Sequence, residues 1–113
     1  MIDEFDKQIK RGMLDVIILN MLMKKSYYGY ELLLEIRSCS TIFKSLKEGT
    51  LYPRLYKLSD RHYLTCQREL SDDKSRLKKV YSITEDGRNQ LEQLLNIWDH
   101  FIEDMTRILE RGN

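Results

Sequence analysis

Hydrophobic residues change their spacing several times along this chain of 113 residues, and each change marks an expected element. From about Gln8 to Lys24 they recur at helical spacing and cover nearly the whole circumference of the later turns. A helix that is apolar all round must be covered on more than one side. We expect that cover to come from the core of the same chain or from a second subunit, and we expect residues 1–7 to be frayed.

Two further helices are expected before residue 61. The first runs from about Gly29 to Ser38, and its residues at helical spacing are Tyr30, Leu33, Leu34 and Arg37. After a polar connection, Ile42, Phe43 and Leu46 are expected to pack beneath the second.

The helix at about 48–61 has two different faces. Leu51, Leu55 and Leu58 recur at helical spacing and share one side. The opposite side is polar and basic and consists of Thr50, Pro53, Arg54, Lys57 and Arg61. Pro53 is expected within about the first turn, where a missing N–H is tolerated. A solvated surface helix would show a similar pattern.

After Arg61 the spacing becomes alternating, which is typical of strands. We expect strands at Leu64–Leu70 and Lys78–Ile83, joined by a polar turn at 71–75. Cationic residues on or near the tip of this hairpin are Arg68, Lys74, Arg76, Lys78 and Lys79. Three helices followed by a hairpin is the order of a winged helix-turn-helix, with the hairpin as the wing.

The last expected helix begins after Thr84, a suitable N-cap, with Glu85 and Asp86 in its first turn. Its apolar residues form a heptad seam with a flanking row beside it. The seam is Leu91, Leu95, Trp98, Ile102, Met105 and Leu109, and the row is Leu94, Phe101 and Ile108. So wide a stripe exceeds the apolar patch usual on monomers, so we expect a homodimer held by this helix. Folding back onto the core would cover only about half of it.

The expected fold class is mainly α with a two-stranded β-hairpin (α+β). We divide the chain into a winged helix-turn-helix DNA-binding region at 1–84 and a C-terminal dimerisation helix at 85–113. The overall charge of +1 hides an asymmetry. Between residues 44 and 79 ten Lys or Arg stand against five acids, and between 85 and 110 two Arg stand against seven acids. A basic middle segment suits a polyanion such as double-stranded DNA.

Other function classes find little support in the sequence. Its longest apolar run, Val16–Leu19, is far too short to span a membrane, and its first residues lack the positive charge of an export signal. We therefore expect a cytoplasmic protein without membrane contact, with Cys39 and Cys66 as reduced thiols. His62 and His100 have no catalytic partners at a recognisable spacing, and we expect no enzyme activity, no cofactor and no metal.

Three blocks of the chain resemble the PadR family of bacterial transcriptional regulators. They are Tyr28–Leu32, Glu48–Leu58 and Tyr81–Gly87, and the resemblance extends over about residues 8–110. It implies a homodimeric winged helix-turn-helix repressor on a pseudo-palindromic operator, with recognition helix 48–61 and dimerisation helix 85–110. The lone C-terminal helix resembles the short subgroup of the family.

One position departs from the family pattern. Many members have a glycine in the turn before the first wing strand, whereas Asp60–Leu64 contains none. The turn must place His62 or Asp60 in an unusual backbone conformation, or it must be slightly longer.

Candidate DNA contacts come from the start of the second helix, from the recognition helix and from the wing. They are Tyr28, Gly29, Gly49, Thr50, Tyr52, Pro53, Arg54, Lys57, Lys74, Arg76 and Lys78. Helix amino ends and hydroxyl groups suit phosphate oxygens, and Arg or Lys side chains suit base edges or phosphates. The structural alternatives are a turn at 28–29, a capping Thr50, a half-buried Tyr52 and solvated charges.

Trp98 is the only tryptophan and lies on the heptad seam. Its distance from residues 84–87 matches the tryptophan with which multidrug-binding members of the family bind flat aromatic ligands. The resemblance thus implies a planar aromatic small-molecule effector, and Asp99 would favour a cationic one. Plain packing between helices is the alternative. For the whole chain, the competing hypothesis is a dimeric protein-interaction module without DNA binding, against which the basic segment argues.

Overall fold

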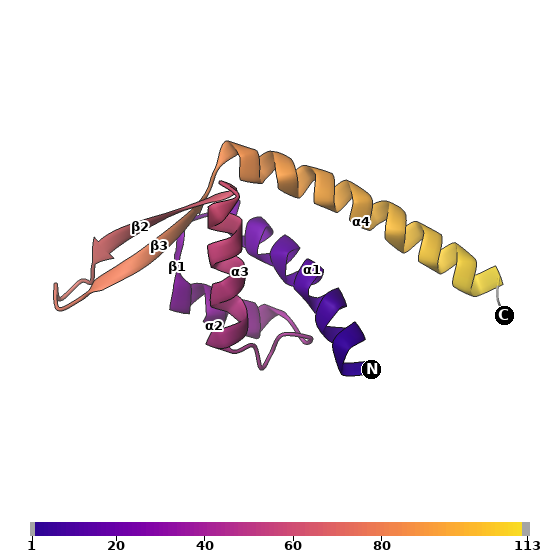
Figure 1. The fold of residues 1–113 in the computed structure, drawn as a ribbon, viewed down its shortest axis with the longest axis horizontal. Helices are drawn as coiled ribbons and strands as arrows, with labels where there is room; N and C mark the ends of the chain where they lie inside the picture. Colours follow the sequence, from indigo (N-terminus) through magenta and orange to yellow (C-terminus); the bar gives the residue numbers. More distant parts are fainter. Residues whose placement is uncertain (1, 112–113) are drawn as a thin grey trace.

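The computed structural model describes the backbone of residues 2–111 and the side chains of residues 4–110. Its elements are α1 (Ile2–Leu22), β1 (Tyr27–Tyr28), α2 (Gly29–Cys39), α3 (Glu48–Asp60), β2 (Leu64–Leu70), β3 (Leu77–Ile83) and α4 (Glu85–Arg111). Helices α1, α2 and α3 form the body, the β2–β3 hairpin extends from one side, and α4 extends towards the other (Figure 1). The predicted winged helix-turn-helix with a long terminal helix is confirmed.

One hydrophobic core joins the three helices of the body to the sheet and to the start of α4. Its buried members are Leu14, Ile18, Leu19 and Leu22 of α1, Leu32, Leu33 and Ile36 of α2, Leu51, Leu55 and Leu58 of α3, and Phe43, Leu46, Leu64, Tyr81 and Leu91. The predicted aliphatic face of α3 is therefore confirmed. On α1, Met13, Val16, Ile17 and Met21 are partly buried against the same core.

Helix α1 begins earlier than we expected from the sequence. The expected fraying is wrong for residues 2–7, which are helical, while residue 1 lies outside the described residues. An ion pair between Asp6 and Lys10, 2.9 Å apart, joins neighbouring turns. Glu4 also suits the positive end of the helix dipole. Phe5 and Ile9 continue the i, i+4 spacing towards the start of α1, although both are exposed in the single chain.

The buried face of α2 differs from the predicted one. Leu33 is buried, but Tyr30 and Leu34 are exposed, and Leu32 and Ile36 lie in the core instead. Gly29 is also buried, where its backbone faces the ring of Tyr52. This contact at the start of α2 helps to set which side of the helix faces the core. In the following connection Phe43 and Leu46 are buried as predicted, whereas Ile42 is exposed, contrary to the prediction.

The predicted hairpin is confirmed, and it gains a short third strand. β2 and β3 are antiparallel, with Leu64 opposite Ile83 at one end and Leu70 opposite Leu77 at the other. β1 pairs with β3 on its other side, so the strand order is β1-β3-β2. Tyr27 faces Tyr81 in this pairing. β1 thereby fastens the start of α2 to the base of the wing.

The turn that follows α3 uses His62 in the left-handed region, with φ of 65°. The amide of His62 donates to the Ser59 carbonyl, and the amide of Tyr63 donates to the Leu58 carbonyl. These two bonds form a Schellman motif, in which glycine is the usual residue at the left-handed position. The predicted use of an unusual conformation in this glycine-free turn is confirmed.

Thr84 connects this turn to α4. Its hydroxyl donates to the His62 carbonyl at 2.7 Å and accepts the Gly87 amide at 2.9 Å, which confirms the predicted N-cap. A Cβ at Gly87 would collide with the Tyr63 carbonyl oxygen. The wing and α4 therefore begin next to each other, where Tyr63, Thr84 and Gly87 pack closely.

Candidate nucleic-acid interface

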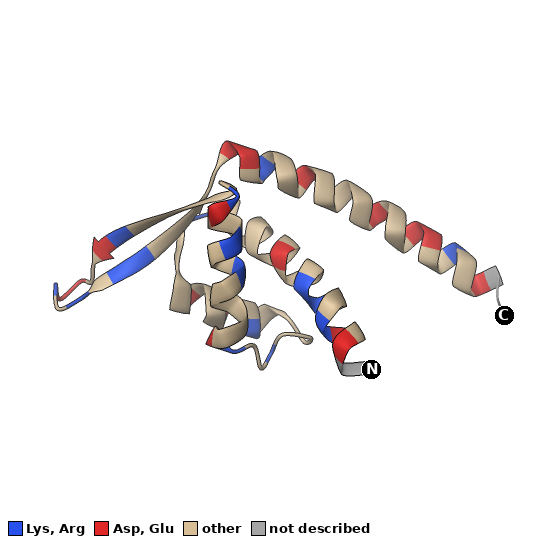
Figure 2. Cartoon of the chain, viewed as in Figure 1, with Lys and Arg blue, Asp and Glu red and all other residues tan. Residues whose placement is uncertain are grey.

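Helix α3 presents a polar face to solvent beside the wing. Gly49, Thr50, Pro53 and Lys57 are all exposed on it. Figure 2 shows Lys and Arg residues along α3 and the wing, whereas Asp and Glu recur along α4. The structure thus places the basic segment found in the sequence on the helix-turn-helix and wing.

The start of α3 leaves its backbone accessible. A Cβ built at Gly49 would meet no atom within 4 Å, so packing within the described chain does not require glycine there. Pro53 lies in the second turn rather than the first, contrary to the prediction. Because proline has no N–H, the Gly49 carbonyl lacks its usual helical donor four residues later. An external hydrogen-bond donor can therefore reach this carbonyl oxygen.

Arg54 points toward α1 and forms an ion pair with Asp15. Its Nε donates to Oδ1 of Asp15 at 2.8 Å, and its Nη2 donates to Oδ2 at 2.7 Å. Both side chains are about one-fifth exposed. Hydrogen bonding to Asp15 raises the pKa of Arg54 despite partial desolvation. Two of the guanidinium donors are thus used within the chain, while the predicted contact of Arg54 with DNA stays a prediction.

The structure brings Tyr52 and Gly29 together. A Cβ at Gly29 would lie 2.6 Å from Cε1 of Tyr52, so only glycine fits without a shift of the ring. The Tyr52 ring also lies 6.2 Å from that of Tyr56, measured between centroids. Desolvation raises the pKa of the Tyr52 hydroxyl, and the nearby Glu48 adds to the shift. The half-buried tyrosine considered from the sequence is what the structure shows.

Tyr28 connects the start of α2 to the wing. Its amide donates to Glu31 Oε1 at 3.2 Å, and its hydroxyl lies 3.4 Å from Glu69 Oε2, to which it donates. The Lys78 ammonium lies 5.1 Å from the centroid of the Tyr28 ring. Desolvation and Glu69 raise the pKa of the Tyr28 hydroxyl. Tyr28 and Lys78 are therefore in contact, and this contact joins the start of α2 to the wing.

A second cation–π contact joins the wing to α3. The Lys79 ammonium lies 5.3 Å from the centroid of the Tyr56 ring, a distance at which the two attract each other. Lys79 is one of the wing cations considered from the sequence for contact with DNA, whereas Tyr56 was not predicted to take part. The sequence carried no signal for this pair, because the two residues are far apart along the chain.

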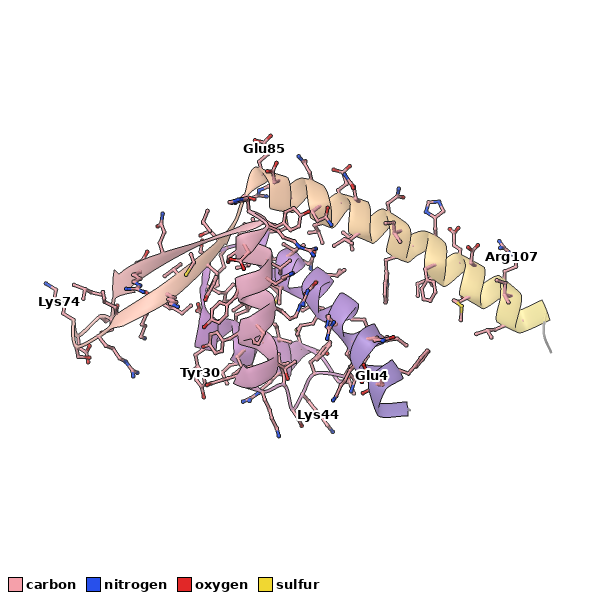
Figure 3. All side chains as sticks on the ribbon, viewed as in Figure 1. Glu4, Tyr30, Lys44, Lys74, Glu85 and Arg107 are labelled. Atoms are coloured by element: carbon pink, nitrogen blue, oxygen red, sulfur yellow. The ribbon has the colours of Figure 1, made fainter. Side chains whose placement is uncertain are left out.

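The tip of the wing is a hydrogen-bonded turn around Asp73. The hydroxyls of Ser71 and Ser75 each donate to Asp73 Oδ1 at 2.6 Å. These donors hold the pKa of Asp73 well below its usual range. Lys74 has a φ of 60° and its amide donates to the Ser71 carbonyl. Its side chain is at the outer end of the wing (Figure 3), and Arg76 is exposed close by in sequence.

Helix α4 divides into a packed start and an uncovered remainder. Leu91 is buried and Leu94 is partly buried against the core, whereas the later stripe residues are exposed in the single chain. These exposed residues are Leu95, Trp98, Phe101, Ile102, Met105, Ile108 and Leu109. Asp99 is exposed as well, and the rings of Trp98 and Phe101 lie 6.1 Å apart. Only two of the nine stripe residues, Leu91 and Leu94, therefore pack against the body, fewer than the half that the sequence led us to expect.

The part of the chain that the structure describes contains neither a membrane-spanning helix nor a cluster of metal-ligating side chains. None of its helices has the length and apolar character needed to cross a membrane. The side chains at 4–110 include no group of three or more His, Cys, Asp or Glu that could hold a metal ion.

Comparisons with known proteins agree with this geometry. The family model described as "Transcriptional regulator PadR-like family" matches residues 18–93. An uncharacterised protein of Lysinibacillus sphaericus is 33% identical over 103 residues, covering 90% of this chain and 93% of the relative. The negative transcriptional regulator PadR of Bacillus subtilis is 31% identical over 78 residues, covering 69% of this chain but only 42% of that longer protein.

Solved structures show the same fold. A PadR family transcription regulator from Clostridium difficile has a TM-score of 0.74 at 28% identity, covering 85% of this chain and 97% of its own. A PadR-like transcriptional regulator from Bacillus cereus has a TM-score of 0.77 at 26% identity, covering 90% and 96%. The likeness therefore includes nearly the whole length of these two proteins.

Proposed function

Because this chain belongs to the PadR-like family of transcriptional regulators, we propose that it works as a homodimeric repressor on a pseudo-palindromic operator in double-stranded DNA. The observation that carries this proposal is the exposed polar face of α3, which lies beside a cationic wing and outside the core. A winged helix-turn-helix places such a helix in the major groove. The printed name of the Bacillus subtilis relative, a negative transcriptional regulator, supports repression rather than activation.

The residues of the interface take different roles in this proposal. Lys57 is exposed on α3 and is the side chain we assign to base edges. Gly49 and Thr50 meet phosphate oxygens, and Lys74 and Arg76 of the wing meet backbone or the minor groove. Among the remaining predicted contacts, Gly29, Tyr52 and Arg54 hold α3 in place through their observed contacts.

Dimerisation is proposed through the uncovered stripe of α4. Its residues from Leu95 onward are apolar and exposed, and they share one helical face. Helix α1 adds Phe5 and Ile9, which are also exposed and stand one turn apart. Burial of these side chains against a second copy would remove an apolar surface larger than monomers usually expose. In functional terms we keep the division into a DNA-binding region at 1–84 and a dimerisation helix at 85–113.

Selection from a pool of random duplexes tests the proposal. The immobilised protein should enrich duplexes with two inverted half-sites whose centres lie about 34 Å apart, or a multiple of that distance. Enrichment without inverted symmetry would contradict a two-fold dimer. No enrichment at all would instead favour the competing hypothesis, a dimeric protein-interaction module of the same fold.

A small-molecule effector is a second candidate function, favoured by the position of Trp98. This residue is about one-third exposed, its ring lies beside that of Phe101, and the next residue, Asp99, is exposed. Two copies near a dimer axis would form a slot for a planar aromatic cation, since stacked aromatic pairs contribute about 0.5–1.5 kcal/mol each. The ligand would release DNA only if it preferred the DNA-free arrangement of the subunits.

Planar cationic dyes test this second candidate. Saturable quenching of the single tryptophan should accompany dye binding, and dye anisotropy should show weaker binding to Trp98→Ala. Dye binding of equal strength to both proteins would place the site elsewhere. Absence of binding in a protein that still binds its operator would leave Trp98 as a packing residue.

A further inference from the structure

A cleft of about 540 Å³ lies between the first half of α1, the connection from α2 to α3 and the start of α3. Apolar side chains that line it include Leu14, Phe43 and Leu46. Five cationic side chains and one acid also line it, namely Lys7, Lys10, Arg11, Lys47, Arg54 and Asp6. This excess of positive charge around the cleft favours the binding of an anionic group.

The observed ion pairs neutralise only part of this charge. Asp6 pairs with Lys10, and Asp15 pairs with Arg54. Among the side chains of residues 4–110, neither Arg11 nor Lys47 has a carboxylate within 4 Å. Both side chains are exposed and able to reach an approaching group. The cleft therefore keeps a positive charge that the described side chains do not neutralise.

The cleft is continuous with the polar face of α3. Gly49, Thr50 and Pro53 line the cleft and also belong to that exposed face. A molecule lying along this side of α3 therefore meets Lys47 and the cations of α1 as well. This continuity favours an extended polyanion over a small ion that would fill the cleft alone.

We propose that this cleft holds the sugar-phosphate backbone of the DNA beside the major groove that α3 enters. The proposal rests on the proposed function and extends the DNA surface to α1, a helix absent from the predicted contacts. Duplex DNA carries one negative charge per about 1.7 Å of its axis, so a groove-bound helix always has phosphates alongside it. Arg11 and Lys47 are the phosphate ligands, and they strengthen binding to every sequence alike.

Salt-dependent titrations of Arg11→Gln and Lys47→Gln test the proposal on a duplex of the selected sequence. Each variant should lower the slope of log affinity against log salt by about 0.9, the value for one phosphate contact. At about 0.1 M salt that slope corresponds to a loss of roughly eightfold in affinity. The preference among base substitutions and the thermal unfolding midpoint should remain those of the unmodified chain.

Lys24→Gln is the matched control, since Lys24 is exposed beyond the other end of α1. It stands thirteen positions after Arg11, about 20 Å away at the helical rise. This variant should keep the original slope. If Arg11→Gln and Lys47→Gln also keep it while the unmodified chain binds DNA, the cleft does not hold the backbone. If the unmodified chain shows no salt-dependent binding to any duplex, the proposed function fails, and the role of the cleft fails with it.

Discussion

Two glycines next to the recognition surface differ in the space available for a side chain. Gly29 is buried against the Tyr52 ring, whereas the Cβ position at Gly49 is open. Gly29→Ala should destabilise the fold by about 1–3 kcal/mol, the usual cost of overpacking. Gly49→Ala should instead stabilise α3 by up to about 1 kcal/mol, since alanine favours helix.

DNA titration separates the two glycines further. At Gly49 the added methyl group would stand where we propose that a phosphate approaches, so Gly49→Ala should bind DNA more weakly despite its stability. Urea unfolding supplies the free energies of unfolding for both variants. Undiminished DNA binding by a stable Gly49→Ala would remove Gly49 from the interface.

Arg54 gives a second prediction at the scale of single residues. It makes two short hydrogen bonds to Asp15, and both side chains are only about one-fifth exposed, so the pair should contribute measurably to stability. A double-mutant cycle with Arg54→Ala and Asp15→Ala should give a coupling energy of about 1–2 kcal/mol. A coupling near zero would indicate that Arg54 is free to serve chiefly as a DNA ligand.

The sequence did not reveal this ion pair or the buried face of α2. Asp15 lies on α1 and Arg54 lies on α3, so the spacing of residues within one helix gives no sign of their contact. Tyr30 and Leu34 fit a helical stripe as well as their neighbours do, so spacing alone could not show which side of α2 faces the core. The missing glycine predicted an unusual conformation at His62 or Asp60, or a longer turn, and the structure places it at His62.

At the scale of elements, removal of a positive charge from α3 and from the wing should have different effects on DNA binding. Lys57→Ala on α3 should change the preference among base substitutions, by about 1–3 kcal/mol at the affected position. Lys74→Ala at the wing tip should weaken binding to all sequences and flatten the salt slope by about one unit. Anisotropy titrations over a panel of half-site variants measure both effects. The reverse pattern would assign sequence reading to the wing.

Elements with a clear period were predicted well, and the rest depended on contacts distant in sequence. β2 was found at its observed bounds because alternation continues over seven residues. β1 has only two residues, too few for any period, and it forms by pairing with residues 80 and 81. The first turns of α1 could have been predicted, since Phe5 and Ile9 continue its apolar spacing.

At the scale of the whole molecule, α4 determines how much apolar surface remains uncovered. The chain measures 60 × 29 × 22 Å, and α4 accounts for much of its length (Figure 1). Leu95→Glu combined with Ile102→Glu should abolish the dimer, because it places charges within the uncovered stripe. Sedimentation velocity should then show monomers or non-specific aggregates.

Gln93→Glu combined with His100→Glu is the matched control for that experiment. These two residues are exposed, have the same spacing of seven, and lie outside the apolar stripe. The control should remain dimeric. A folded dimer from the stripe variant would show that the chains associate through another surface.

The most direct test of the central claim, sequence-specific DNA binding by a dimer, compares two duplexes at several salt concentrations. One carries the selected half-sites, and the other has the same composition with both half-sites scrambled. The account predicts two chains per duplex, affinity that falls steeply with salt, and a preference for the selected duplex of at least about 1,000-fold. Equal affinity for both duplexes, or binding that does not depend on salt, would contradict it.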